Sequence, residues 1–166
     1  MKMHWLYMRY VVRHKWYVFL AGLQLRVPLW RLVLHDWTKF LPREWLPYAR
    51  WFYGGWRQNH YTGESDAPPD LKAAYDRAWC HHMHKNDHHW QFWVMVFDMG
   101  DEAILPMSDA ARREMLADWI GAGRAIMGKA ADTRMWYLDN RHKMRLHSET
   151  RAWIETQLSV AGGRSE

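Results

Sequence analysis

The chain has 166 residues and a formal net charge of +5, from 23 Lys and Arg against 18 Asp and Glu. With 49% apolar and 25% charged residues, it suits one domain with its own core, and the composition excludes a chain that is disordered throughout. The single cysteine, Cys80, excludes a disulfide framework and a zinc site built from several cysteines. The modest positive charge permits a small phosphate-bearing partner, and it neither calls for nucleic acid nor excludes it.

Helical periodicity predicts four helices in the first half of the chain. The first spans about 5–25, and Pro28 begins a second that runs to about Lys39. An aromatic helix follows Pro42, and a fourth covers about 69–85, after a loop over 59–69 rich in Gly, Ser, Asp and Pro.

No membrane-spanning segment is predicted. The longest uncharged stretch near the start, 16–25, has ten residues, whereas a spanning helix needs roughly 20. No small-residue cleavage site follows it, so the stretch does not fit a signal peptide. We therefore expect a cytoplasmic protein that does not bind membranes, working in the bacterial host if a phage encodes it.

Helices also dominate the predicted second half. A break at Asn86-Asp87 precedes a short helix over 88–96, and a turn covers 98–106. Three further helices follow, whose predicted caps are Ser108, Asp132 or Thr133, and Ser148. No strand pattern stands out. We predict an all-α fold: one compact domain of about six to eight helices over 1–160, with a disordered tail over 161–166.

Four groups of residues carry the side chains that metals prefer. They are His14, the pair His35-Asp36, five histidines within 81–89, and the pair Glu114 and Asp118. Divalent cations in hydrolases are held by neutral imidazoles and carboxylates that converge from several helices. On a helix, His35 and Asp36 would point about 100° apart, so they could serve one metal or bridge two. Glu114 and Asp118 are four residues apart and would share a helix face.

Each group alone has an ordinary structural explanation. A lone histidine such as His14 is more often packed or on the surface than a ligand. The five clustered histidines would spread around one helix, so two or three of them must lie away from a metal. Glu114 and Asp118 could lie on a solvated face beside nearby arginines. Only the combination favours a metal site.

The order of His14, His35-Asp36-x-x-Lys39, a His-rich segment and Asp118 resembles the HD superfamily of all-helical metal-dependent phosphohydrolases. In that superfamily a first His, an adjacent His-Asp and a later Asp hold the metal, and extra histidines hold two or three metals. The His-Asp-x-x-Lys segment and the doublet His88-His89 are similar to the branch that hydrolyses cyclic dinucleotides. The Gly-Tyr-Pro that follows the doublet in that branch is missing here.

A closer similarity is to a family of phage and bacterial proteins that has no established function. This likeness covers most of the chain. The motifs that carry it are His35-Asp36-x-x-Lys39-Phe40, Ala78-Trp79-x-His81-His82-x-x-x-Asn86-x-His88-His89-Trp90, Glu114-Met115-x-x-Asp118-Trp119, and Trp136-Tyr137. His81 and His88 are seven residues apart, so ligation by both requires either a break at Asn86-Asp87 or an unbroken helix beside the metals.

The HD resemblance implies a phosphohydrolase, either a phosphodiesterase or a nucleotidase, that acts on a small nucleotide or other phosphoester through a metal-activated water. It implies one or two divalent metal ions (Mn, Fe, Zn or Mg). The expected metal ligands are His14, His35, Asp36, His81, His82, His88, His89 and Asp118. The expected catalytic residues are Asp36, Glu114 as a ligand or general base, and Lys39, which with Arg124 would offset phosphate charge.

Other functions fit the same residues. An HD-like di-iron oxygenase would use a related ligand set, and iron content and oxygen uptake would distinguish it. A non-catalytic phage or bacterial accessory protein would use the metal only to stabilise its core, which 13 tryptophans enrich. A partner-binding protein would present an aromatic surface over Trp51, Phe52, Tyr53 and Trp56. The sequence does not indicate an oligomeric state.

Overall fold

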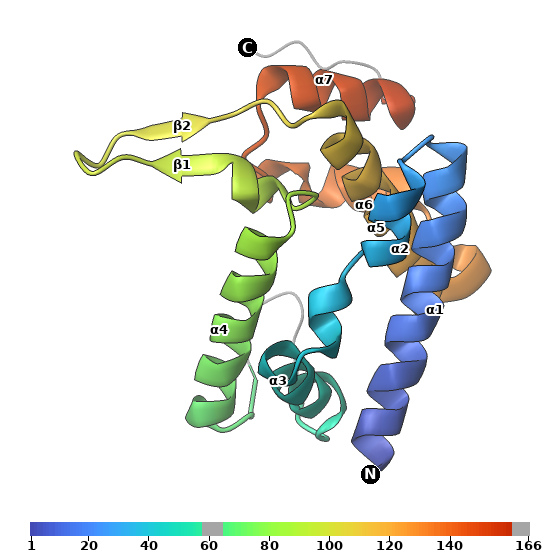
Figure 1. Cartoon of the computed structure of the whole chain (residues 1–166), viewed down its shortest axis with the longest axis vertical. Helices are drawn as coiled ribbons and strands as arrows, with labels where there is room; N and C mark the ends of the chain where they lie inside the picture. The colour runs from blue at the N-terminus through green and yellow to red at the C-terminus, as the bar shows by residue number, and fades with distance from the viewer. Residues whose placement is uncertain (58–64, 161–166) are drawn as a thin grey trace.

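The computed structural model describes residues 1–57 and 65–160, and helices make up most of it (Figure 1). The described residues contain seven α-helices, which confirms the predicted all-α fold. They are α1 Lys2–Gln24, α2 Leu29–Leu34, α3 Pro42–Tyr53, α4 Pro69–Lys85, α5 Asp109–Met127, α6 Thr133–Asn140 and α7 Ser148–Gln157. Short 3-10 helices are η1 Trp37–Phe40, η2 Trp90–Trp93, η3 Gly128–Ala130 and η4 Arg141–Lys143.

The pair α1 and α5 forms the centre of the fold. The inward face of α1 repeats at helical spacing and includes Val11, His14 and Val18, all buried. Gly121 on α5 permits the close approach of the two helices, because a Cβ at that position would lie 2.7 Å from the backbone nitrogen of Val18. His14 is therefore carried into the core as part of an otherwise apolar helix face.

The predicted second helix, from Pro28 to Lys39, is wrong beyond Leu34. The chain is extended at His35 and takes a left-handed conformation at Asp36, with φ 55° and ψ 25°. Aspartate tolerates this conformation better than most residues because its short polar side chain can bond locally. The break turns both side chains inward, with His35 2% and Asp36 1% exposed.

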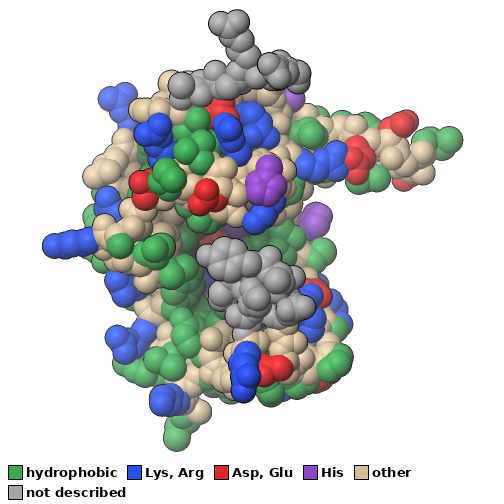
Figure 2. Space-filling model, turned by 180° about the vertical axis from the view of Figure 1, so that it is seen from behind, with side chains coloured by type: hydrophobic (Ala, Val, Ile, Leu, Met, Phe, Trp, Pro, Cys, Tyr) green, Lys and Arg blue, Asp and Glu red, His purple; other side chains and the backbone are tan. Residues whose placement is uncertain are grey.

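The predicted helix over 88–96 and the turn over 98–106 are replaced by η2 and a β-hairpin. Strand β1 (Val94–Val96) pairs antiparallel with β2 (Glu102–Ile104), with Val94 opposite Ile104. Gly100 has φ 88°, and its N–H donates to the carbonyl of Phe97 at 2.8 Å, which closes the turn. The hairpin projects from the helical body as an arm (Figures 1 and 2).

Two predicted caps are confirmed and one is wrong. Ser108 accepts the N–H of Ala111 at the start of α5, and Asp132 accepts that of Met135 at the start of α6. The cap of α7 is His147 instead of the predicted Ser148, because the His147 ring accepts the N–H of the second helical residue. The helix predicted to reach Met144 ends earlier, at Asn140, and η4 follows.

Some predictions concern parts of the chain outside the described residues. The segment 161–166, for which a disordered tail is predicted, lies there entirely, as does most of the predicted loop over 59–69. None of the helices in the two described ranges combines the length and the apolar character needed to cross a membrane.

Candidate metal centre

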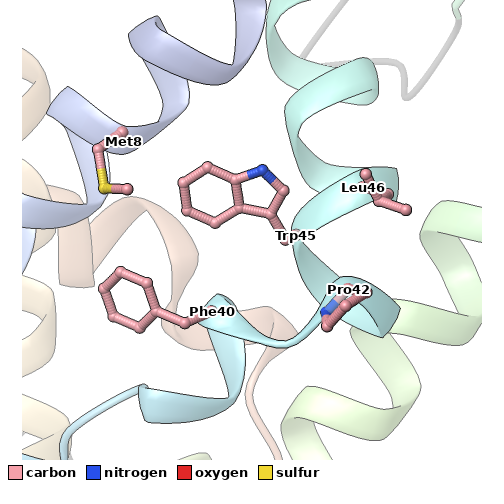
Figure 3. A pocket seen from close by; sticks show the side chains of 5 residues that line it. All are labelled: Met8, Phe40, Pro42, Trp45 and Leu46. Atoms are coloured by element: carbon pink, nitrogen blue, oxygen red, sulfur yellow. The ribbon is translucent and has the colours of Figure 1, made fainter.

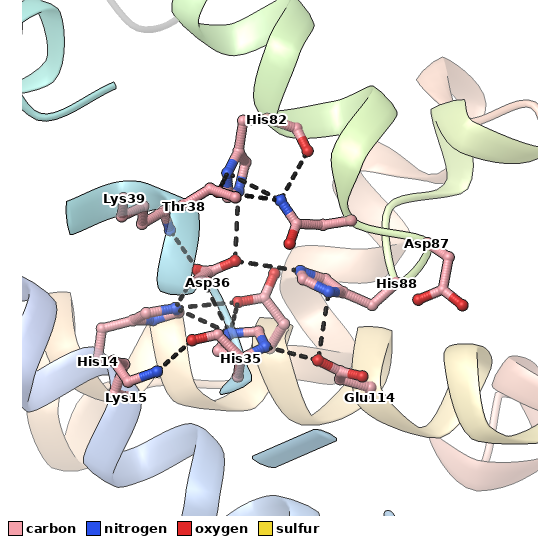
Figure 4. A network of polar contacts seen from close by, with 12 residues as sticks. His14, Lys15, His35, Asp36, Thr38, Lys39, His82, Asp87, His88 and Glu114 are labelled. Atoms are coloured by element: carbon pink, nitrogen blue, oxygen red, sulfur yellow. Dashed lines mark hydrogen bonds and ion pairs between the residues drawn. The ribbon is translucent and has the colours of Figure 1, made fainter. Parts of the chain in front are cut away.

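Seven of the eight predicted ligands converge, together with Glu114, from five parts of the chain, and Figure 4 shows His14, His35, Asp36, His82 and His88 among them. His14 comes from the middle of α1, His35 and Asp36 from the break before η1, and Glu114 with Asp118 from α5. The remaining ligands come from the end of α4 and the turn after it, and they are His82, His88 and His89. Helix α4 ends at Lys85 and Asn86 is extended, which is the break that ligation by the second histidine doublet required.

The first group of ligating atoms contains His14, His35, Asp36 and Asp118, which lie within 4.8 Å of one another. His14 Nε2 is 3.2 Å from Asp36 Oδ2 and 3.2 Å from Asp118 Oδ1. His35 Nε2 is 3.4 Å from the same Asp36 oxygen and 3.5 Å from the same Asp118 oxygen. Two imidazoles and two carboxylates at these separations can coordinate one cation without a change of fold.

The second group contains Asp36, His82, His88 and His89. Here the contacts are made by the other carboxylate oxygen: Asp36 Oδ1 is 3.3 Å from His82 Nε2 and 3.4 Å from His88 Nε2. Asp36 is therefore the only residue shared by the two groups, with one oxygen toward each. A carboxylate placed in this way can bridge two cations.

Orphaned polar atoms mark the second group. Four side-chain atoms are buried there without a hydrogen-bond partner among the described residues: Asp36 Oδ1 and the Nε2 atoms of His82, His88 and His89. Burial of polar atoms without partners costs free energy, so each such atom in a native protein needs an explanation. Coordination of a cation would satisfy all four together, so these residues fit a divalent metal ion.

Glu114 contacts the Nδ1 atoms of two histidines, on the side of each ring away from the centre. Its Oε1 accepts from His35 Nδ1 at 2.9 Å and lies 3.3 Å from His88 Nδ1. Arg31 in turn donates to Glu114 Oε2 at 2.5 Å and also pairs with Asp87. With Nδ1 as the donor, a neutral ring presents the lone pair of Nε2 to the centre. Glu114, His35 and His88 also form a third possible metal group, but these contacts suit an orienting carboxylate better.

Glu44 performs the same task for His82, although it is not among the predicted site residues. It is fully buried, and its two oxygens accept from His82 Nδ1 at 3.0 Å and from His81 Nδ1 at 2.6 Å. Thr38 also donates to Glu44 at 3.1 Å. No sequence signal indicated this role, because a glutamate in the first turn of a helix is common for reasons of the helix dipole alone.

Two of the clustered histidines lie outside the centre. His81 donates to Glu44 and belongs to none of the metal groups, contrary to its place in the predicted ligand set. His84 is exposed, and its Nδ1 lies 2.8 Å from the carbonyl oxygen of Cys80, which agrees with its exclusion from the ligand set. Adjacent residues on α4 point in different directions, so only His82 of this pair faces Asp36.

Burial and charge together set the protonation of the carboxylates. Burial would raise the pKa of Asp36, but the charges of His35, Lys39 and His82 hold it well below its usual value. The side chain of Asp118 is 14% exposed; its partial burial would raise its pKa, but its contacts with His14 and His35 hold that pKa well below the usual value. Both carboxylates are therefore ionised, as metal ligation requires.

The pKa values of His88 and His89 are shifted in opposite directions. Burial would lower the pKa of His88, but its contacts with Asp36 and Glu114 outweigh burial and raise it to about 10. Burial lowers the pKa of His89 well below its usual value, and the neighbouring charges of His88 and His82 lower it further. His89 is thus a neutral imidazole with an unsatisfied Nε2, the form in which histidine binds metals.

The predicted phosphate-binding cations are placed differently from one another. Lys39 lies against the centre, with its Nζ 2.5 Å from Asp36 Oδ2 and its side chain 13% exposed. Arg124 is exposed on α5 and contacts none of the residues in the metal groups. Lys15, which is not among the predicted site residues, donates to the carbonyl of His35 and so fixes the backbone at the break.

Two pockets reach the centre from different sides. One, of about 300 Å³, touches His89 and Asp118, one ligand from each group. Its other walls include Trp79, Trp90, Trp119, Trp136, Asn140 and Lys143. The other, of about 390 Å³, reaches His35, His88 and Glu114, and Arg31 lies in its wall.

Comparison with known protein families matches residues 3–160 to the family of unknown function DUF5662. The match covers nearly the whole chain, so the chain belongs to this family. No curated protein and no solved structure matches it.

Proposed function

Starting from this family membership, we propose that the chain is a metal-dependent phosphohydrolase of HD-like type. It would hydrolyse a small nucleotide or other phosphoester, as a phosphodiesterase or a nucleotidase. One or two divalent cations (Mn, Fe, Zn or Mg) would occupy the two groups that share Asp36. The motif resemblance also leads us to propose a phage or bacterial origin and a cytoplasmic site of action.

The observation that carries the proposal is the position of Asp36. Its two oxygens face two different sets of imidazoles, and the second set contains buried nitrogen atoms that lack hydrogen-bond partners among the described residues. A purely structural polar cluster would be expected to satisfy these atoms. A divalent cation held by these residues would lower the pKa of a bound water to about 7 and so make hydroxide available at neutral pH.

The protein residues have separate tasks in this scheme. Glu114 and Glu44 hold the Nδ1 atoms of His35 and His82, so the Nε2 atoms remain directed at the centre. Lys39 donates to Asp36 and offsets part of the negative charge of the two carboxylates. Because Lys39 is buried against Asp36, we propose that it neutralises the charge of this carboxylate and does not contact a substrate phosphate directly.

The substrate is proposed to enter through the tryptophan-lined pocket. Both pockets that reach the centre within the described residues touch a ligand from each group, so the chemistry of their other walls decides between them. Its tryptophans offer flat apolar walls for a ring, and Lys143 with Asn140 offers polar groups for a phosphate or a sugar. In the other pocket Arg31 is engaged by Asp87 and Glu114. A nucleotide fits the first environment better.

Metal analysis and an activity panel test the proposal. Protein purified without a His-tag is analysed for Mn, Fe, Zn and Mg, and then assayed with phosphomonoesters, phosphodiesters and nucleotides in the presence of each metal. We expect bound metal and metal-dependent hydrolysis that Asp36→Asn abolishes. Asp76→Asn is the matched control, because Asp76 is exposed on α4 and pairs only with Lys72 among the described residues. Metal binding without hydrolysis of any substrate would contradict the proposal, and oxygen uptake by an iron-loaded protein would indicate the oxygenase alternative.

A further inference from the structure

Helix α1 has a second apolar face, on the side away from the core. Trp5, Met8, Val12 and Trp16 recur at helical spacing and are 63%, 36%, 55% and 58% exposed. Val33 of α2 and Phe40 of η1, which flank α1, are also exposed, by 66% and 44%. Monomeric proteins rarely expose large apolar side chains in one contiguous set.

Two hollows lie along this face. The first, of about 270 Å³, is lined by Met8, Phe40, Pro42, Trp45 and Leu46, and Figure 3 shows Met8, Phe40 and Trp45 directed toward the same space. The second, of about 380 Å³, lies between α1 and α2. Its walls are Val12, Lys15, Trp16, Phe19, Leu32, Val33 and Phe40. Because Phe40 borders both hollows, they form one continuous feature, which we call the α1 groove.

The groove lies in the basic part of the chain. Residues 1–35 contain six Lys and Arg and no Asp or Glu, whereas the remaining 131 residues contain 17 Lys and Arg against 18 Asp and Glu. Lys2 and Arg9 are exposed on α1 beside the apolar stripe and form no ion pair within the described residues, whereas Arg13 donates to the carbonyl of Arg124 on α5. Figure 2 shows hydrophobic side chains next to Lys and Arg side chains along the edge opposite the hairpin.

The end of the hairpin arm has the complementary character. Val96, Phe97 and Met99 are 63%, 47% and 89% exposed on a two-stranded arm that stands clear of the body (Figures 1 and 2). Asp98 and Asp101 lie in the same turn, and neither is in an ion pair with another described residue. The tip is therefore apolar and acidic, whereas the α1 groove is apolar and basic.

We propose that the hairpin tip of one copy of this chain docks into the α1 groove of a second copy. Phe97 and Met99 would occupy the two hollows, and Asp98 and Asp101 would face Lys2 and Arg9 of α1. With about 200 Å² for a fully exposed large side chain, the groove residues expose several hundred Å², approaching the roughly 800 Å² that one partner contributes to a standard interface. A lipid surface or an unrelated protein could cover the groove alone, but a second copy satisfies the groove and the tip together.

The contact joins two different surfaces, so each copy carries one tip and one groove. This arrangement allows a test by complementation. Met99→Asp places a charge on the tip, and Val12→Glu places a charge in the groove; both residues are exposed, so neither change disturbs the core. Ile126→Asp on α5 is the matched control, because Ile126 is 70% exposed and lies outside both surfaces.

Sedimentation equilibrium from micromolar to sub-millimolar protein measures the effect. Wild type and Ile126→Asp are expected to associate as concentration rises, and Met99→Asp and Val12→Glu each to associate at least about tenfold more weakly. An equal mixture of these two variants should form a one-to-one complex that grows no further, because it retains one intact tip and one intact groove. Adding Arg9→Glu to a chain with Asp98→Arg should restore association that each single change weakens.

Several outcomes would overturn the proposal. Wild type that stays monomeric throughout the concentration range contradicts it, as does association that survives Met99→Asp. A mixture of the tip and groove variants that remains monomeric also contradicts it. Monomeric wild type that binds vesicles containing phosphatidylserine, with binding lost in Val12→Glu, would assign the groove to a membrane surface. Circular dichroism of each variant confirms that a loss of association does not come from unfolding.

Discussion

The two histidine doublets of this chain behave differently, although only five residues separate them. His81-His82 lies within α4, and the pair divides: His82 faces Asp36, whereas His81 turns to Glu44 Oε1. His88-His89 lies after the break at Asn86, and both rings join the same ligand group, with ring centroids 4.3 Å apart. Successive side chains on a helix diverge by about 100°, so a helix delivers one of two neighbours to a given point.

The same contrast holds for His35-Asp36. These adjacent residues would diverge on a continuous helix, but the extended backbone at His35 and the left-handed backbone at Asp36 bring both side chains into the centre. The single predicted ligand His14 and the spaced carboxylates Glu114 and Asp118 need no such break, since α1 and α5 present them directly. Regular helices therefore supply isolated ligands here, and the two chain breaks supply the adjacent ones.

The largest expected effect comes from Asp36, the ligand shared by both groups. Asp36→Asn keeps the size of the side chain and the tolerance for a left-handed backbone, but removes the charge that a divalent metal needs. We expect loss of metal and a fall in turnover of about three orders of magnitude or more, with little change in melting temperature. Activity, metal content and thermal melting of the variant and of chelator-treated wild type provide the measurement.

The opposite pattern would support a structural metal. In that case metal binding contributes folding free energy directly, so chelation and Asp36→Asn should both lower the melting temperature sharply. Wild type would then hydrolyse no phosphoester with any metal. Asp76→Asn, which changes an exposed carboxylate on α4, controls for the general effect of removing one negative charge.

The next effect tests the break that brings His88 and His89 inward. Asn86 donates through Nδ2 to the His82 carbonyl at 2.8 Å and to Thr38 Oγ1 at 3.3 Å. Asn86→Ala removes both bonds and favours continuation of α4, so we expect metal affinity to fall by about 10- to 100-fold. Metal titration measures it. His84→Ala is the control, because it removes an exposed histidine from the same helix end and should leave the affinity unchanged.

The convergence of most predicted ligands could be predicted from residue types and the motif resemblance. His14, His35, Asp36, His82, His88, His89 and Asp118 all fall in the two groups, and the excluded His84 lies on the surface. The predictions that failed were those of local geometry. The helix through His35 and Asp36 was wrong because periodicity does not register one residue with a positive φ, and the hairpin was missed because Trp90–Trp93 continues a helical pattern up to the strand.

The supporting residues could not be predicted, for a different reason. Glu44 and Arg31 act through side chains that lie 38 and 83 residues from their partners in sequence. Their own segments look like ordinary helix starts, so nothing local distinguishes them. Such contacts depend on how α2 and α3 pack against the rest of the chain, which hydrophobic periodicity alone does not determine.

A smaller effect tests one of these supporting residues. Glu44→Gln replaces an acceptor-only group by one whose NH₂ can face the N–H of His82 or His81, so the orientation of the His82 ring weakens. We expect metal affinity to fall by about tenfold, with the fold intact by circular dichroism. The matched control is Glu149→Gln, since Glu149 also lies in the first turn of its helix, on α7, and is exposed. If Glu149→Gln lowers metal affinity as much as Glu44→Gln does, then Glu44 acts through the helix dipole and not through its hydrogen bond to the histidine.

The smallest expected effect on the centre comes from the packing of the two regular helices. A Cβ at Gly121 would lie 2.7 Å from the backbone nitrogen of Val18, so Gly121→Ala must push α5 away from α1. We expect a loss of about 1–3 kcal/mol in the free energy of unfolding, measured by denaturant titration. His14 Nε2 and Asp118 Oδ1 are 3.2 Å apart across this interface. Because the shift of α5 would separate these two atoms, metal affinity should weaken several-fold. The control is Gly123→Ala on the same helix, where the nearest atom, Ala131 Cβ, is 3.4 Å away. Alanine there should be neutral or stabilise the helix by up to about 1 kcal/mol. If both variants lose stability equally, then close packing of α1 on α5 does not set the separation of these two ligands.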